Sequence, residues 1–95
     1  MGTKPTHLGG ALFNSVRLAI LRLMFTRPRQ EYYYRELTKA VGMGQGAVQR
    51  ELRALVHAGI LLKLGTRRRM FYRPNPDCPI YSELRSLFRK LAQNP

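Results

Sequence analysis

Glutamine and arginine side chains recur along residues 45–57 in a pattern that suits contact with base pairs. A glutamine amide can pair with adenine, and an arginine guanidinium can pair with guanine, in the major groove of DNA. If Val48, Leu52 and Leu55 face a core, then at about 100° per residue the opposite side of the same helix carries polar and cationic residues. That opposite side consists of Gly46, Gln49, Arg50, Arg53 and His57. We therefore predict base contacts from Gln45, Gln49, Arg50 and Arg53 and a phosphate or solvent environment for His57. The alternative is a solvated polar face, for which the helix offers one acidic residue, Glu51.

A second cationic cluster, Arg67, Arg68 and Arg69, lies between two short apolar segments. Three arginines in a tight hairpin repel one another, and a DNA backbone or a narrow minor groove would offset that repulsion. The alternative is an exposed basic loop that aids solubility. Tyr33, with Arg35 beside it, is a further candidate for a phosphate contact, although the tyrosines of residues 32–34 also suit core and edge packing.

The charge of the whole chain supports a polyanionic partner. Lys and Arg total 17 against 5 Asp and Glu in 95 residues, which gives a formal net charge of +12. Of the 17 cations 13 are arginine, whose planar fork suits phosphates and guanine edges, so nucleic acid is favoured over a membrane surface. The hydrophobic content of 44% is enough for a core, and no apolar run is long enough to cross a bilayer.

Enzymatic and metal-binding functions find no support in the residue pattern. There is no glycine-rich Walker loop to bind nucleotide phosphates, and no cluster of His, Cys, Asp and Glu is present in the sequence. Cys78 is the single cysteine, so it cannot form an internal disulfide. A small apolar filler is its simplest role, and a reactive redox thiol is the alternative. We expect a cytoplasmic protein without a catalytic site, metal or cofactor.

The elements that position these residues follow from hydrophobic spacing and from glycine and proline. We expect one domain over residues 11–95, mainly α with a small β-hairpin, after a flexible N-terminal arm over residues 1–10. The predicted elements are a helix over 11–25, a short strand over 32–34, a helix over 35–41 ending at Gly42, a helix over 45–58 ending at Gly59, strands over 60–64 and 70–72, and a last helix capped by Asp77. The order is therefore helix, strand, helix, helix, hairpin, helix, which is that of a winged helix-turn-helix.

Residues 33–37, 46–55 and 58–61 give this chain a resemblance to the arsenic-repressor-like (ArsR-like) winged-helix transcriptional regulators, over about residues 11–90. The resemblance implies a prokaryotic regulator that binds double-stranded DNA, with residues 45–58 in the major groove and a basic wing, residues 65–70, on the minor groove or backbone. Gly44 stands where related sequences have a Ser or Thr helix cap, and Gly44 and Gly46 would let a phosphate approach the helix start. Metal-sensing relatives use paired cysteines, which this chain lacks.

The resemblance also implies a homodimer held by the first and last helices. On a helical wheel, Leu18, Leu21 and Phe25 fall opposite the core stripe of the first helix, so we expect them to meet a second chain. The last helix contributes its apolar stripe, which contains Leu84, Leu87, Phe88 and Leu91. An alternative function keeps this fold but uses the basic face for a protein or RNA partner, as in an adaptor or antitoxin-like module.

Overall fold

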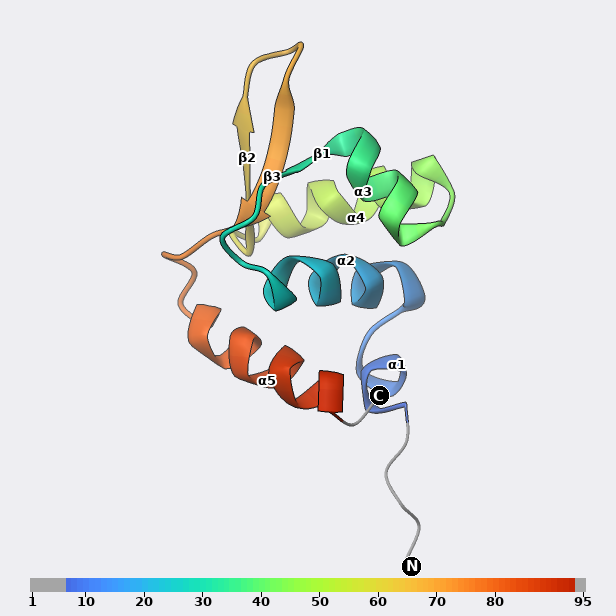
Figure 1. Ribbon diagram of the computed structural model, residues 1–95, viewed down its shortest axis with the longest axis vertical. Coiled ribbons are helices and arrows are strands. Elements are labelled where there is room, and N and C mark those ends of the chain that lie inside the picture. The colour runs from blue at the N-terminus through green and yellow to red at the C-terminus, as the bar shows by residue number, and fades with distance from the viewer. Residues whose placement is uncertain (1–6, 94–95) are drawn as a thin grey trace, which may run out of the picture.

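The computed structural model describes residues 7–93 and is mainly helical, with one small sheet. Within that range the elements are α1 (Leu8–Leu12), α2 (Ser15–Thr26), β1 (Tyr32–Tyr33), α3 (Tyr34–Val41), α4 (Gln45–His57), β2 (Leu61–Gly65), β3 (Met70–Pro74) and α5 (Tyr81–Gln93) (Figure 1). The predicted fold class and element order are confirmed, apart from the changes described below.

The sheet is antiparallel, with the order β1-β3-β2, so β3 pairs with both other strands. The β2–β3 hairpin stands out from the helical body (Figure 1). It closes through two backbone bonds: the Thr66 N–H donates to the Arg69 carbonyl over 3.3 Å, and the Arg69 N–H donates to the Thr66 carbonyl over 3.2 Å. Gly65 precedes this turn with φ of 98°, and a Cβ there would collide with the Arg69 carbonyl oxygen. The tight turn of the wing therefore requires glycine at position 65.

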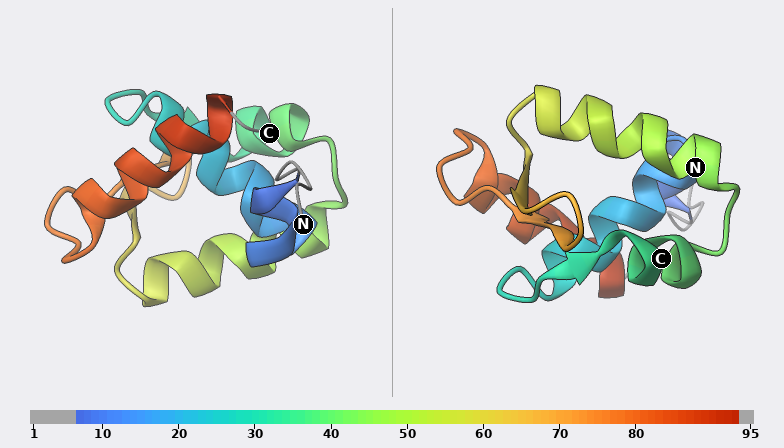
Figure 2. Two further views of the ribbon diagram at one scale, coloured as in Figure 1. Left: turned by 90° about the horizontal axis from the view of Figure 1, so that it is seen from below. Right: turned by 90° about the horizontal axis from the view of Figure 1, so that it is seen from above.

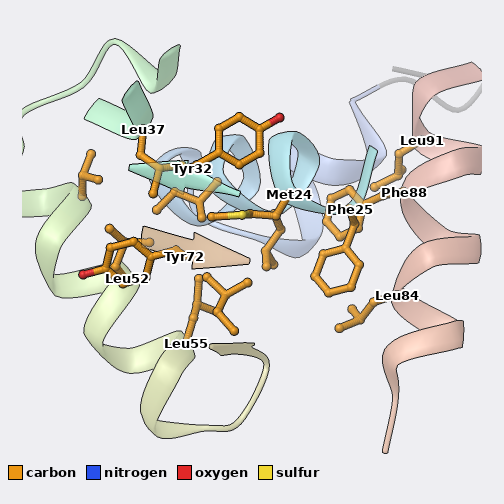
Figure 3. Close-up of a cluster of buried hydrophobic side chains, with 14 residues drawn as sticks. Met24, Phe25, Tyr32, Leu37, Leu52, Leu55, Tyr72, Leu84, Phe88 and Leu91 are labelled. Atoms are coloured by element: carbon orange, nitrogen blue, oxygen red, sulfur yellow. The ribbon is translucent and has the colours of Figure 1, made fainter. Parts of the chain in front are cut away.

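Helix α2 is the centre of the molecule, between α3 and α4 on one side and α5 on the other (Figures 1 and 2). On the first side, Ile20 and Met24 are fully buried with side chains of α3, α4 and β2, including Leu37, Val48, Leu52, Leu55 and Leu61. On the second side, Phe25 stacks on Phe88 of α5 with ring centroids 6.1 Å apart. Figure 3 shows both groups of side chains around α2. The buried side chains therefore form one continuous core that packs against two faces of α2.

The burial of α2 corrects the reason for expecting a dimer. Leu21 and Phe25 are each 2% exposed within a single chain, in the same buried cluster as Leu84, Phe88 and Leu91 of α5, which are 8%, 1% and 2% exposed. Helix α5 packs against α2, so α5 of the same chain covers this side of α2. Leu18 and Leu87 are half-buried. We expected the second apolar side of the first helix to have no packing partner within the chain, and this expectation was wrong. A helical wheel shows that a face is apolar, but it cannot show whether the same chain or a second chain packs against that face.

The predicted helix over 11–25 is two helices. Phe13 is extended, with φ of −130° and ψ of 152°, and the Asn14 side chain caps α2 by accepting a hydrogen bond from the Arg17 N–H over 2.8 Å. Leu8–Gly10, expected in a flexible arm, belong to α1, and Gly9 is buried where an added Cβ would lie 2.7 Å from Leu18 Cδ1. His7 precedes α1, and residues 1–6 of the predicted arm lie outside the described residues. Glycine at position 9 allows the close packing of α1 on α2.

Other predicted bounds differ as well: α4 ends at His57 instead of residue 58, β2 covers Leu61–Gly65 instead of 60–64, and β3 continues to Pro74 instead of ending at residue 72. Two further differences have a local cause. Tyr34 begins α3 instead of extending the strand, because the Glu36 carboxylate accepts the Tyr33 N–H over 2.9 Å and fixes the helix start there. Asp77 does not cap α5, which begins at Tyr81. The Asp77 N–H instead donates to the Asn75 side-chain oxygen over 3.0 Å, within a turn that precedes the helix.

Candidate nucleic-acid interface

Helices α3 and α4, joined by residues 42–44, form the helix-turn-helix unit. Gly42 ends α3 in the left-handed conformation, with φ of 69°, and this helix end was predicted from the sequence. Val48, Leu52 and Leu55 are 0%, 1% and 3% exposed, so the predicted core face of α4 is confirmed. The predicted base-contacting residues, Gln45, Gln49, Arg50 and Arg53, are all exposed on the remaining surface of α4, and so is His57.

The start of α4 is attached to the start of α3. The Tyr34 hydroxyl donates a hydrogen bond to the Gln45 carbonyl over 3.3 Å. Gly44 is the residue before α4 and provides no side-chain cap, as predicted. An added Cβ at Gly44 or Gly46 would meet nothing within 4 Å, so the backbone is open to solvent at both positions. The first turn of α4 therefore presents an accessible, positively polarised helix end.

Glu51, the single acidic residue of α4, is turned toward α2. Its Oε2 accepts from Arg17 Nη2 over 2.8 Å and from Arg17 Nε over 3.0 Å, and its Oε1 accepts from Asn14 Nδ2 over 2.8 Å. Partial burial raises the pKa of Glu51, but the hydrogen bonds from Asn14 and Arg17 and the charges of Arg17 and Arg50 outweigh burial, so the pKa lies below its ordinary value. The charge of Glu51 is thus neutralised within the protein, and the outer face of α4 stays cationic.

The wing and the start of α3 meet in space. Arg67, Arg68 and Arg69 are exposed at the tip of the hairpin. The Arg69 guanidinium lies 5.7 Å from the centre of the Tyr33 ring, and Arg69 Nη2 donates to the Tyr33 hydroxyl over 3.3 Å. Arg35 is exposed and lines the same shallow depression as Tyr33 and the three wing arginines.

The sequence pattern groups Tyr33 with Arg35, but it does not reveal the contact between Tyr33 and Arg69, 36 positions later. The pairing of β1 with β3 produces this contact, since Tyr33 lies opposite Phe71 in the sheet. The rings of Tyr33 and Phe71 pack edge to face with centroids 5.9 Å apart. The phenol is therefore held on the outer face of the sheet, below the wing tip.

A second depression lies between the outer face of α4 and the hairpin, and only its α4 side was predicted from the sequence. It is lined by Gln49, Arg53, Val56 and His57 of α4, by Lys63 of β2 and by Tyr72 of β3. We call it the α4–hairpin cleft. Lys63 was predicted only as part of a strand. It is the one charged residue among the apolar residues 60–64, and this isolated charge is the feature of the sequence that could have indicated a functional role.

The described residues, 7–93, also bear on metal ligation, on the single cysteine and on membrane insertion. Within that range no group of three or more His, Cys, Asp and Glu side chains could hold a metal ion. Cys78 is buried, at 7% exposure, in keeping with a small apolar filler. No helix in the described part of the chain is long and apolar enough to cross a membrane.

Comparison with known proteins gives a family and a consistent fold. The family model "Bacterial regulatory protein, arsR family" matches residues 14–63. Reduced HlyU from Vibrio cholerae has a similar structure, with a TM-score of 0.66 at 21% identity over 88% of this chain and 80% of that one. Rv0081 from M. tuberculosis gives a TM-score of 0.65 at 25% identity, again over 88% and 80%.

The homodimeric winged helix-turn-helix DNA-binding domain of Mb0332 from Mycobacterium bovis gives a TM-score of 0.61 at 26% identity, over 90% of this chain and 71% of that one. No curated protein matches the sequence. The likeness to Mb0332 and the element order agree that the fold is a winged helix-turn-helix.

Proposed function

Because the chain belongs to the arsR family of bacterial regulatory proteins, a family of DNA-binding transcription regulators, we propose that it binds a specific sequence of duplex DNA as a homodimer. The observation that carries this proposal is the outer face of α4, which combines exposed glutamine and arginine side chains with the internal neutralisation of Glu51. A polar helix face that contacted only water would not need its acidic residue, Glu51, to be neutralised by another part of the chain.

In the proposed complex α4 lies in the major groove. Gln45, Gln49 and Arg50 belong to its N-terminal half, which is the part of a recognition helix that contacts base edges. Gln45 and Gln49 would pair with adenine, and Arg50 with guanine. Arg53 follows one turn after Gln49 on the same face. The exposed backbone at Gly44 and Gly46 supports a phosphate contact at the start of α4.

The wing is proposed to contact the DNA backbone or the minor groove. Its support is the surface shared by Arg67, Arg68 and Arg69 with Tyr33 and Arg35, since two parts of the chain bring cations and a phenol to one place. Arg69 is pre-positioned by the Tyr33 ring, whereas Arg67 and Arg68 are exposed at the tip. The wing would add phosphate contacts that strengthen binding to every sequence.

The homodimer is proposed from the Mb0332 domain, which is homodimeric, and from apolar surface left on the terminal helices. Leu8 and Leu12 of α1 are 39% and 63% exposed, and Ile80, just before α5, is 48% exposed. Together with the half-buried Leu18 and Leu87, these residues form the proposed contact surface. Leu21, Phe25, Leu84, Phe88 and Leu91 would support that surface from within the core.

Selection of bound fragments from random duplex DNA tests the proposal. We expect enrichment of a near-palindromic site whose half-sites lie about one helical turn apart, as two α4 helices of a dimer require. The double variant Gln49→Ala/Arg50→Ala should lose the enriched sequence, while the control Arg29→Ala, in the exposed turn before β1, should retain it. Failure to enrich any duplex, together with retention of structured RNA or an acidic protein, would instead support the adaptor function.

A further inference from the structure

The α4–hairpin cleft has the composition of an anion site. It lies along α4 from Gln49 to His57, between that helix and the two strands of the wing. Arg53 and Lys63 approach it from different elements, and no acidic residue is among its lining residues. In the part of the chain that the structure describes, no carboxylate forms an ion pair with either cation. Two like charges that share a cleft repel each other unless an anion lies between them.

The cleft is also organised by regular structure. Gln49, Arg53 and His57 are spaced by four residues, so they form one row along α4. Lys63 and Tyr72 are direct partners across the β2–β3 pair, and adjacent side chains of such a pair lie on the same face of the sheet. Both strands therefore direct a polar group toward the row on α4.

Tyr72 provides a neutral donor at the base of the cleft. Its side chain is buried, at 7% exposure, and Figure 3 shows its hydroxyl pointing toward α4. Burial and the neighbouring Tyr34 raise the pKa of the Tyr72 phenol, while the charge of Arg53 lowers it, and the net shift is upward. The phenol is therefore protonated near neutral pH. A protonated phenol donates one hydrogen bond.

We propose that the α4–hairpin cleft binds a phosphate group through Arg53, Lys63 and the Tyr72 hydroxyl, and that Arg53 contacts the DNA backbone instead of a base edge. The proposal rests on the proposed function in taking a DNA phosphate as the principal ligand. A free phosphate has the same chemistry, and the experiment separates the two sources. Arg53 lies eight residues after Gln45, about 12 Å along α4, and is thus beyond the N-terminal turns that read bases.

The first experiment measures affinity for DNA over a salt series with Lys63→Ala, Arg53→Ala and the charge-matched control Arg29→Ala. Each phosphate contact adds about −0.9 to the slope of log affinity against log salt. A dimer has two clefts, so each cleft variant should flatten the slope by about 1.8, and its deficit relative to wild type should shrink about 12-fold between 50 and 200 mM salt. The loss should be equal on the selected duplex and on random DNA.

The second experiment titrates the protein without DNA with inorganic phosphate and follows the NMR signals of Lys63 and Tyr72. A flattened slope without phosphate-induced shifts supports the proposal with DNA as the source. Shifts in the wild type that Lys63→Ala abolishes support it with a free phosphate as the source, even if the protein binds no DNA and the proposed function fails. A wild-type slope in both cleft variants together with no shifts would overturn it, as would a change of base preference in Arg53→Ala.

Discussion

Loss of the Arg17–Glu51 ion pair should destabilise the protein, and the size of the effect depends on how far the pair is buried. The Arg17 side chain is 40% exposed and the Glu51 side chain 15%, so solvent screens Arg17 more than Glu51. Exposed ion pairs contribute about 0.2–1 kcal/mol, and contacting residues couple by about 0.5–3 kcal/mol. We therefore expect a coupling energy of about 1 kcal/mol between the two residues. Glu51→Ala should cost more, about 2 kcal/mol, because it also removes the acceptor of Asn14.

Equilibrium denaturation measures this coupling energy when it is applied to wild type, Arg17→Ala, Glu51→Ala and the double variant. All four proteins are compared at one protein concentration, because the stability of a dimer depends on protein concentration. Glu31→Ala, which changes an exposed acid, is the control. The lowered pKa of Glu51 means that its charge stabilises the fold above the ordinary value of 4.5 and that this contribution is lost as pH falls through the lower folded-state value. The gap between wild type and Glu51→Ala should narrow below that pH. Additive single effects, or a gap that stays constant in acid, would refute the reasoning.

Four further variants have simple expected outcomes. Arg50→Ala should cost about 1–3 kcal/mol of DNA binding and relax preference at one base position, and unchanged preference in a repeated selection would exclude a base contact. Replacing Arg67, Arg68 and Arg69 with alanine should flatten the salt slope by about 0.9 for each phosphate that the wing no longer neutralises, whereas parallel lines would show that the wing does not meet DNA. Gly46→Ala should raise the stability of α4 by about 1 kcal/mol, because the added Cβ meets nothing, but weaken DNA binding; undiminished affinity would show that no phosphate approaches Gly46. Leu21→Glu should unfold the protein, since it places a charge in a site that is 2% exposed, and circular dichroism of a folded monomer would contradict this.

The sequence predicts those parts of the fold that depend on neighbouring residues. Gly42 and Gly59 end α3 and α4 with φ of 69° and 80°, a backbone conformation that glycine adopts without a steric cost. The burial of Val48, Leu52 and Leu55 follows from helical spacing alone. These signals lie within a few positions of the structure that they determine, so the helix-turn-helix could be predicted closely.

The cover of α2 could not be predicted in the same way. Leu21 and Phe25 produce the same apolar pattern whether a second chain or a distant helix of the same chain covers them. Phe88, on which Phe25 stacks, is 63 positions later in the sequence. The position of α5 depends on the turn before it, where Asn75 Nδ2 donates to the Gly59 carbonyl over 2.9 Å. Local periodicity carries no information about such a contact.

The candidate site shows the same division. Exposure of Gln49 and Arg50 follows from the helical wheel, but the neutralisation of Glu51 needs Asn14 and Arg17, which lie 37 and 34 positions earlier. The helical wheel places Glu51 to one side of the polar face and gives it no partner. The prediction of a single helix over 11–25 also hid the cap at Asn14, because α1 and α2 were merged. An error in one local boundary thus concealed Asn14, one of the two long-range partners of Glu51.

Three attachments along α4 explain how the proposed dimer would set the spacing of its two recognition helices. The Tyr34 hydroxyl holds the start of α4, Glu51 joins its middle to α2, and Asn75 binds the Gly59 carbonyl just after its end. Helix α2 also packs against α1 and α5, which carry residues of the proposed dimer contact. The orientation of α4 relative to the partner is therefore determined by polar contacts at three points as well as by the apolar core. A rigid orientation lowers the entropic cost of matching two half-sites at a fixed separation. Weakening the middle attachment should therefore reduce discrimination between half-site spacings more than it reduces affinity for a single half-site.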